Sequence, residues 1–192
     1  MIWTKRLRLT PAQPPRRSTS SLDDMSQPSG PTAKVLFRVA EDDGSANVET
    51  LWAYDLGEDR YRLDNSPFYA YSVSVGDVVL APVDPDEGRP TYQKVLEKSG
   101  NRTVRVILDP PLSNGNSSDE VVQELLSLGC SYEGANPGYL CIVIPQESDF
   151  GLVCERLTSR NIQWEHADPD YSELYPDDVE QSVRAIAGRR LR

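Results

Sequence analysis

The stretch TVRVILDPPLSNGNSSDEVVQELLSLG, residues 103–129, determines the architecture of the second half of the chain, because its hydrophobic period changes along it. Its first six residues, T-V-R-V-I-L, are rich in β-branched side chains and predict a strand. Ser117, followed three residues later by Glu120, predicts a capping box. Gly129 predicts the end of the helix. The apolar residues at helical spacing between them are Val121, Val122, Leu125 and Leu126.

A second copy of this pattern follows. Strands are expected at 130–133 and 139–144, then a helix capped by Asp149, then a last strand at 162–165. The order β-α-β-β-α-β over residues 102–167 predicts a ferredoxin-like module. Such modules include metal binders, RNA binders, small-molecule sensors and interaction modules, so the fold alone implies no function.

Residues 34–101 have a different texture, with short alternating runs separated by turn signals about every ten residues. Strands are expected at 34–40, 48–54, 60–63, 78–82 and 91–98. These are too few for a sandwich, so a small SH3-like β-barrel is predicted. With the second module, the predicted fold class is α+β.

The two ends of the chain differ from these modules. Residues 1–33 form a basic leader with Pro and Ser and no hydrophobic period, so disorder is expected. A transit peptide, a nucleic-acid arm or a true start at Met25 are the alternatives. Residues 168–192 form an acidic, proline-interrupted tail with a short C-terminal helix. This helix either docks on the domain or binds a partner. Its apolar face would be Val179, Val183, Ile186 and Ala187.

Composition limits the classes of partner. The 192 residues carry a formal net charge of −10, which argues against a broad phosphate-binding surface and against nucleic acid as the partner. No apolar run has the length of a membrane span, and no secretory signal is evident, so a cytoplasmic protein without membrane contact is expected. The three cysteines have no C-x-x-C spacing, which fits buried, reduced thiols and no metal site.

The segment YRLDNSPFYAY, residues 61–71, is the candidate binding site. It combines aromatic rings with Arg and Asn, the mixture typical of binding hot spots. In the alternative interpretation, Phe68 and Tyr71 fill the core while Asp64 and Asn65 satisfy loop amides. The predicted binding residues are Arg62, Asp64, Asn65, Pro67, Phe68 and Tyr69, together with Arg105 on the strand at 103–108.

Several short motifs carry a family resemblance. L-F-R-V, V-E-T-L-W-A, R-Y-R-L-D-N-S-P-F-Y-A, G-D-V-V, S-G-N-R-T-V-R and L-G-C-S-Y-E occur in this order between residues 34 and 166. The chain therefore resembles a bacterial family of small proteins known only as a domain of unknown function, with R-L-D-N-x-P-F-[FY]-A as its most specific element. Relatives often carry His within S-G-x-x-T-x-R, where this chain has Asn101 and Arg102. This departure argues against a histidine-based reaction, and the resemblance implies no activity.

Catalytic chemistry is not expected from the residues. No G-x-S-x-G elbow, P-loop, G-x-G-x-x-G or H-E-x-x-H motif is present. His166 is the only histidine and is expected to be a solvated edge residue. The acidic cluster at 84–87 lacks metal-ligand spacing and is interpreted as a turn, so no metal and no cofactor are predicted. The only pair of interest for acid–base work is Asp64 with Arg62.

Two functional hypotheses remain. The first is a non-enzymatic, acidic protein-interaction module that binds a basic protein, for example as an inhibitor or immunity-type partner. The second is a small-molecule sensor or enzyme that binds an anionic ligand between the two modules, with Arg62 and Arg105 as the clamp.

Overall fold

The fold consists of two antiparallel sheets, one of which carries two helices. The computed structural model describes residues 30–40 and 46–177. The five-stranded sheet contains, in order, β1 (Ala33–Ala40), β2 (Ala46–Asp55), β3 (Arg60–Leu63), β4 (Val78–Leu80) and β7 (Lys94–Glu97). A small hairpin is formed by β5 (Val83–Asp84) and β6 (Arg89–Pro90).

The four-stranded sheet has the strand order β11-β8-β10-β9. Its strands are β8 (Arg102–Ile107), β9 (Ser131–Asn136), β10 (Tyr139–Ile144) and β11 (Gln163–Asp168). The helices are α1 (Ser117–Ser127), α2 (Phe150–Ser159) and the short α3 (Tyr171–Leu174). The α+β class is confirmed, and the chain order β8-α1-β9-β10-α2-β11 agrees with the predicted one.

The inner face of the five-stranded sheet is set by the alternation along β2. Leu51 and Ala53 are buried, while Val48 and Trp52 on the other face are exposed. Trp52 is covered on one side by the ammonium group of Lys34, which lies 4.4 Å from the centre of the ring. The core of this sheet is completed by Val35, Phe37, Tyr61, Leu63, Ala70, Val73, Val79 and Ala81.

The predicted closed barrel is not found. β1 and β7 are the edges of the five-stranded sheet, and no ladder joins them in the described part of the chain. Instead, Leu36 of β1 forms a parallel bridge with Thr91, and the amide of Tyr92 donates to the carbonyl of Leu36 at 2.8 Å. Residues expected to form one polar turn fold as the β5–β6 hairpin, and β1 meets the chain just after it. The sheet therefore curls without closing through β7.

The helix ends lie at the predicted residues, except that the start of α1 is shifted by one position. Asn116, not Ser117, caps α1, because its Oδ1 accepts the amide of Asp119 at 2.9 Å. Gly129, with φ of 88°, follows the end of that helix as predicted. Asp149 caps α2 as predicted, accepting the amide of Leu152 at 3.0 Å.

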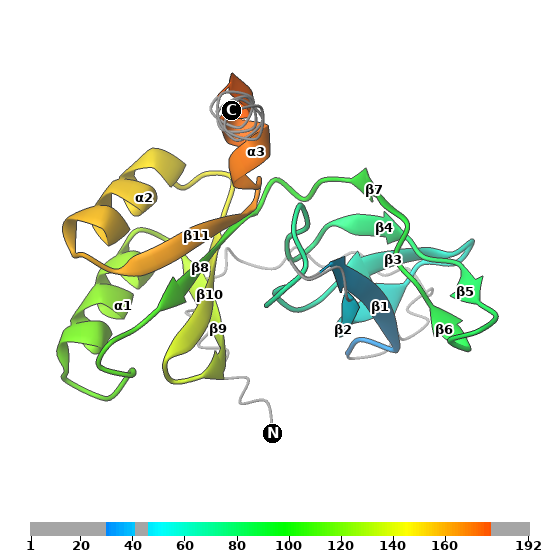
Figure 1. The fold of residues 1–192 in the computed structure, drawn as a ribbon, viewed down its shortest axis with the longest axis horizontal. Coiled ribbons are helices and arrows are strands. Elements are labelled where there is room, and N and C mark those ends of the chain that lie inside the picture. The colour runs from blue at the N-terminus through cyan, green and yellow to red at the C-terminus, as the bar shows by residue number, and fades with distance from the viewer. Residues whose placement is uncertain (1–29, 41–45, 178–192) are drawn as a thin grey trace, which may run out of the picture.

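The four-stranded sheet has two unlike faces. Val104 and Val106 pack under both helices in an apolar core. The alternate residues Thr103 and Arg105 are also buried, but on the opposite face, which meets the five-stranded sheet (Figure 1). The two halves of the molecule are therefore joined across the helix-free face of the second sheet.

The described chain ends near this joint. The predicted tail begins at 168, but the structure places Asp168 at the end of β11 and buries it. α3 follows and projects at the top of Figure 1. The predicted leader up to residue 29 and the predicted C-terminal helix lie outside the described residues. In the described ranges no helix is long and apolar enough to span a membrane.

Candidate functional site

The segment between β3 and β4, residues 64–77, forms the contact between the two sheets, and we call it the junction loop. Its amides are held by Glu49 of β2, whose carboxylate accepts the N–H groups of Phe68, Tyr69 and Ala70 at 2.7, 3.0 and 2.9 Å. Glu49 is buried. A carboxylate removed from water in this way is stabilised because several donors converge on it.

The second sheet supplies donors to three carbonyls of the junction loop, those of Pro67, Phe68 and Ala70. Arg105 is 2% exposed, and its Nε donates to the carbonyl of Pro67 at 3.3 Å. Its Nη2 donates to the carbonyl of Ala70, and its Nη1 to Glu165 at 3.0 Å. The guanidinium carbon also lies 4.4 Å from the centre of the Tyr71 ring. Arg105 therefore anchors the loop through three kinds of partner at once.

Two further side chains of β10 reach the same loop. The hydroxyl of Tyr139 donates to the carbonyl of Phe68 at 2.6 Å, and Sγ of Cys141 donates to that of Pro67 at 3.2 Å. Burial raises the pKa of the Cys141 thiol, which keeps it protonated and able to donate. In this loop Ser66 Oγ is buried without a hydrogen-bond partner.

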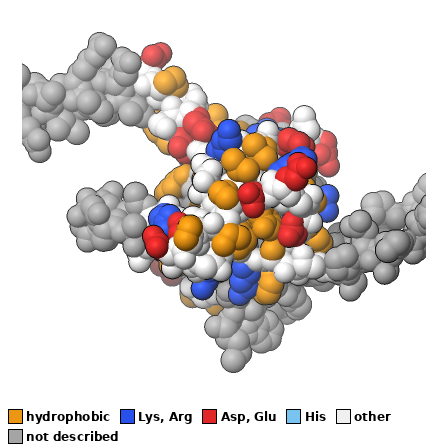
Figure 2. Space-filling view, turned by 90° about the vertical axis from the view of Figure 1, so that its right-hand side faces the viewer, with side chains coloured by type: hydrophobic (Ala, Val, Ile, Leu, Met, Phe, Trp, Pro, Cys, Tyr) orange, Lys and Arg blue, Asp and Glu red, His pale blue; other side chains and the backbone are white. Residues whose placement is uncertain are grey.

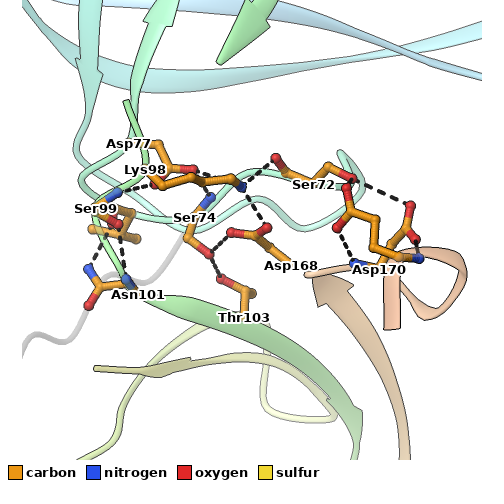
Figure 3. Close-up of polar contacts among 11 residues, drawn as sticks. Ser72, Ser74, Asp77, Lys98, Ser99, Asn101, Thr103, Asp168 and Asp170 are labelled. Carbon is orange, nitrogen blue, oxygen red and sulfur yellow. Dashed lines mark hydrogen bonds and ion pairs between the residues drawn. The ribbon is translucent and has the colours of Figure 1, made fainter. Parts of the chain in front are cut away.

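A polar network closes the other end of the joint (Figure 3). Oγ of Ser74 donates to Asp168 at 2.5 Å and lies 2.8 Å from the hydroxyl of Thr103. Nζ of Lys98 lies 2.6 Å from Asp168 and 3.3 Å from Asp77. The network thus ties the junction loop to β11, β8 and the chain just after β7.

A serine, a lysine and an aspartate in contact can form a nucleophile with its base, but this geometry does not support that chemistry. Ser74 is 0% exposed, so no substrate reaches its hydroxyl. Burial lowers the pKa of Lys98, but Asp168 and Asp77 outweigh this effect and raise the pKa above its ordinary value. The amine is therefore held as ammonium and is unable to accept a proton. The network is interpreted as structural.

A groove of about 960 Å³ opens beside the joint, and we call it the aromatic groove. It runs between α2, β11 and α3. Its lining residues are Tyr71, Phe150, Gly151, Cys154, Glu155, Thr158, Trp164, Glu165, His166, Asp170, Tyr171, Ser172 and Tyr175.

Aromatic rings surround His166 in this groove. The ring of Trp164 meets it edge-on at 4.7 Å, and those of Phe150, Tyr171 and Tyr175 lie 5.7, 6.1 and 6.2 Å away. Nδ1 of His166 is buried and has no hydrogen-bond partner among the described residues. Burial lowers the pKa of His166, so its ring is neutral at neutral pH. His166 lies on an edge strand, as predicted, but these rings half-bury it, so the expected solvation is only partial.

The charge in the aromatic groove has one sign. Among the described residues, the lining contains the carboxylates of Glu155, Glu165 and Asp170 and no Lys or Arg. Glu165 is paired with Arg105, and Asp170 accepts the amide of Glu173 as the cap of α3. Across the part of the chain that the structure describes, Glu155 makes no hydrogen bond or ion pair. The groove therefore offers aromatic faces and negative charge, a combination suited to a cation.

A second, smaller cavity of about 550 Å³ lies on the helix-free face of the four-stranded sheet. Tyr139, Ile107 and Gln163 stand side by side across three strands there, as the strand register shows. Tyr69, which is 56% exposed, overhangs them from the junction loop.

The predicted binding residues fall into four places. Pro67, Phe68 and Arg105 are buried in the joint, as the alternative interpretation of the segment expected for Phe68. Tyr69 lines the second cavity. Asn65 accepts the amide of Trp52 at 2.6 Å, and half-buried Asp64 donates its own amide to the carbonyl of Trp52 at 2.8 Å. Arg62 is exposed, stacks 5.0 Å from the centre of the Tyr54 ring and lines neither cavity.

The residues of the aromatic groove were not predicted as a site. Tyr171 and Tyr175 stand four positions apart, a helical spacing that indicates one shared face. Trp164 and His166 alternate along an edge strand. Those two signals were available in the sequence, whereas the meeting of α2, β11 and α3 depends on tertiary packing.

Metal and thiol chemistry find no support at these places. Within residues 30–40 and 46–177 no cluster of His, Cys, Asp and Glu could hold a metal ion. All three cysteines are free, and burial raises the pKa of Cys154, which lines the groove, to about 11. Its thiol is therefore protonated and weakly nucleophilic at neutral pH.

The fold and its sites define a class of α+β protein in which a loop from one antiparallel sheet is clamped by the bare face of another. The chain belongs to the family described as "Domain of unknown function (DUF4265)", which matches residues 49–166. Its fold is similar to that of a hypothetical protein from Neisseria gonorrhoeae, with a TM-score of 0.60 and 13% identity, over 73% of this chain and 96% of that one. A search of curated proteins gives no match.

Proposed function

We propose that the protein is a non-enzymatic interaction module that binds a basic protein through the aromatic groove. The observation that carries this proposal is the lining of that groove, which in the described part of the chain combines five aromatic side chains besides His166 with three carboxylates and no Lys or Arg. Aromatic anchors beside charged groups are typical of binding hot spots. An inhibitor or immunity-type protein that covers a basic enzyme is one form of this function.

The overall charge supports the same partner. The net charge of −10 favours fast encounter with a basic surface. This charge does not form one continuous field, because acidic, basic and apolar side chains are interspersed over the end formed by the five-stranded sheet (Figure 2). A local acidic groove, rather than the whole surface, therefore supports a specific contact.

The experiment that tests this function is a quantitative pull-down with the full chain from the cytosol of its source organism. The groove variant is Glu155→Gln/Tyr175→Ala. Tyr69→Ala reports on the second cavity, and Glu120→Gln on α1 is the matched control outside both. We expect a basic protein whose affinity falls about tenfold or more in the groove variant alone and decreases with salt. An acidic partner, or equal capture by the groove variant, would contradict the proposal.

The second cavity supports a second candidate function, the binding of a small molecule between the two sheets. Its volume of about 550 Å³ lies in the range of ligand sites. The proposed pair of arginine clamps does not fit, since Arg62 lies elsewhere and Arg105 is engaged with backbone carbonyls and Glu165. A thermal-shift screen of metabolites against wild type and Tyr69→Ala separates this candidate from the first. A shift that survives Tyr69→Ala would count against it.

We also propose a fold type for each half of the chain. The strand order β11-β8-β10-β9 with both helices on one face supports a ferredoxin-like module over residues 102–168. We infer a relation to SH3-like sheets for residues 33–97 from their strand number and curl, without closure. A bacterial, cytoplasmic protein is the setting in which we place this function.

A further inference from the structure

Two tyrosine side chains of the aromatic groove are each about half exposed to solvent. Tyr171 and Tyr175 are 51% and 46% exposed, and their ring centres lie 4.7 Å apart with an interplanar angle of 38°. The indole N–H of Trp164 donates to the hydroxyl of Thr158 at 3.2 Å, which fixes the orientation of that ring in the groove wall. A planar group can therefore stack on these rings without first displacing a packed core.

Carboxylates reach the aromatic groove from three different elements. Glu155 comes from α2, Glu165 from β11 and Asp170 from the turn before α3. Glu165 and Asp170 already have partners, and Glu155 has none among the described residues. A cation that enters the groove therefore finds at least one carboxylate whose charge is not yet neutralised.

The molecule already contains the contact that such a cation would make. The guanidinium of Arg105 lies 4.4 Å from the centre of the Tyr71 ring while it pairs with Glu165 at 3.0 Å. Tyr71 and Glu165 also line the aromatic groove. Similarly, Arg102 lies 5.1 Å from the centre of the Phe150 ring, another lining residue. Two arginines of the chain itself thus already pack their guanidinium groups against aromatic residues that line the groove.

An arginine fits this arrangement better than a lysine. Its guanidinium is planar, stacks on aromatic faces, is weakly hydrated and forms forked hydrogen bonds with carboxylates. An ammonium is a compact and strongly hydrated charge that gains less from ring faces.

We propose that the aromatic groove binds an arginine side chain of the partner, with its guanidinium stacked on Tyr171 and Tyr175 and paired with Glu155. This inference deepens the proposed function, because it names the anchoring group at the same site. Because the ring of His166 is neutral, the lining residues within 30–40 and 46–177 carry no positive charge that opposes this group.

The test uses N-acetyl-arginine amide as the probe, with the full chain observed by NMR. The indole N–H of Trp164 reports on the groove, and that of Trp52, on the first sheet, is an internal reference. N-acetyl-citrulline amide is the neutral analogue of nearly the same shape, and N-acetyl-lysine amide is the cationic analogue without a planar head. We expect a saturable shift of the Trp164 signal with the arginine probe, about fivefold weaker binding of the lysine probe and no binding of the citrulline probe.

Variants locate the site. Glu155→Gln and Tyr175→Leu are each expected to weaken the arginine probe about fivefold or more, whereas Glu120→Gln leaves it unchanged. Equal binding of citrulline, or no shift of Trp164 with arginine, would overturn the proposal. Binding that appears only when residues 178–192 are removed would assign the groove to this chain's own tail and would also overturn it.

The two proposals fail separately. If a basic protein is captured through the groove but the arginine probe does not bind, the arginine anchor is wrong and the function stands. If the arginine probe binds at Trp164 but no basic protein depends on the groove, the site stands and the proposed function is wrong.

Discussion

Two neighbouring regions of the molecule, the joint and the aromatic groove, differ in how many of their polar groups have hydrogen-bond or ion-pair partners. At the joint, amides meet Glu49, carbonyls meet Arg105 and Tyr139, and of the junction-loop side chains only Ser66 has a buried oxygen without a partner. In the groove, three tyrosine side chains are about half exposed, and Glu155 has no partner in the described chain. The contact of Ser74, Lys98 and Asp168 at the joint is thus structural. A ligand is expected to bind in the groove, where side chains still lack partners.

The largest effect should come from Arg105→Leu, which removes the buried guanidinium that donates to the carbonyls of Pro67 and Ala70 and leaves the Pro67 carbonyl with only the weak thiol donor of Cys141. We expect a loss of about 3–5 kcal/mol in the free energy of unfolding, measured by urea denaturation. Arg62→Leu, an exposed arginine, is the control and should change stability by less than about 0.5 kcal/mol. If both variants had the same free energy of unfolding, Arg105 would contribute no more to stability than an exposed arginine does.

A smaller loss is expected from Glu49→Gln. The amide keeps the shape of the side chain, but its NH₂ group faces backbone N–H donors and cannot accept from them. Leaving such donors unsatisfied costs about 1–3 kcal/mol, which urea denaturation resolves. Glu97→Gln, whose exposed ion pair with Arg60 spans 3.0 Å, is the control and is worth about 0–1 kcal/mol. If both substitutions cost the same, Glu49 does not organise the junction loop.

The pH dependence of the free energy of unfolding reports on the groove through its only histidine, His166. Burial lowers the pKa of His166 in the folded state, so the unfolded chain binds the proton more readily. Its contribution to stability is therefore present above the unfolded pKa of about 6.5 and lost as pH falls below it. Urea midpoints at pH 7.5 and 5.5 should fall further for wild type than for His166→Gln. An identical decrease in both proteins would show that His166 does not titrate in this window.

The smallest effect on stability is expected for Tyr175→Ala, although it removes a wall of the groove. Tyr175 lies at the surface end of α3, so the free energy of unfolding should change by less than about 0.5 kcal/mol. Thermal and urea unfolding check this, and binding of the arginine probe should be lost in the same sample. A loss above about 2 kcal/mol would make the ring a packing residue and would weaken the case for an open site.

The sequence predicts the elements of the second sheet because local signals there agree with the packing. Val121 and Leu125 recur at helical spacing, and Asp149 and Gly129 mark helix ends as predicted. The shift of the first cap from Ser117 to Asn116 is a choice between adjacent polar residues that only backbone geometry decides. That the first sheet stays open was not predictable, because it depends on where β1 meets the chain after the β5–β6 hairpin.

The site was harder to predict than the fold. The composition of residues 61–71 indicated a binding surface, but the same aromatic and polar mixture serves to join two sheets, and Phe68 is 7% exposed. Nothing local to Arg105 shows that its partners are the carbonyls of residues 38 and 35 positions earlier in the chain. The aromatic groove is likewise assembled from segments that are separate in sequence.

The placement of Asp168 has a consequence for the order in which the protein is completed during synthesis. Ser74 and Tyr71 each wait 94 positions for their partners Asp168 and Glu165 on the last strand. Arg105 and Tyr139, which donate to the loop carbonyls, are synthesised earlier, so only the contacts to Asp168 and Glu165 wait until β11 leaves the ribosome. A ribosome stalled before residue 163 would hold a chain in which Ser74 and Tyr71 lack these two partners on the last strand.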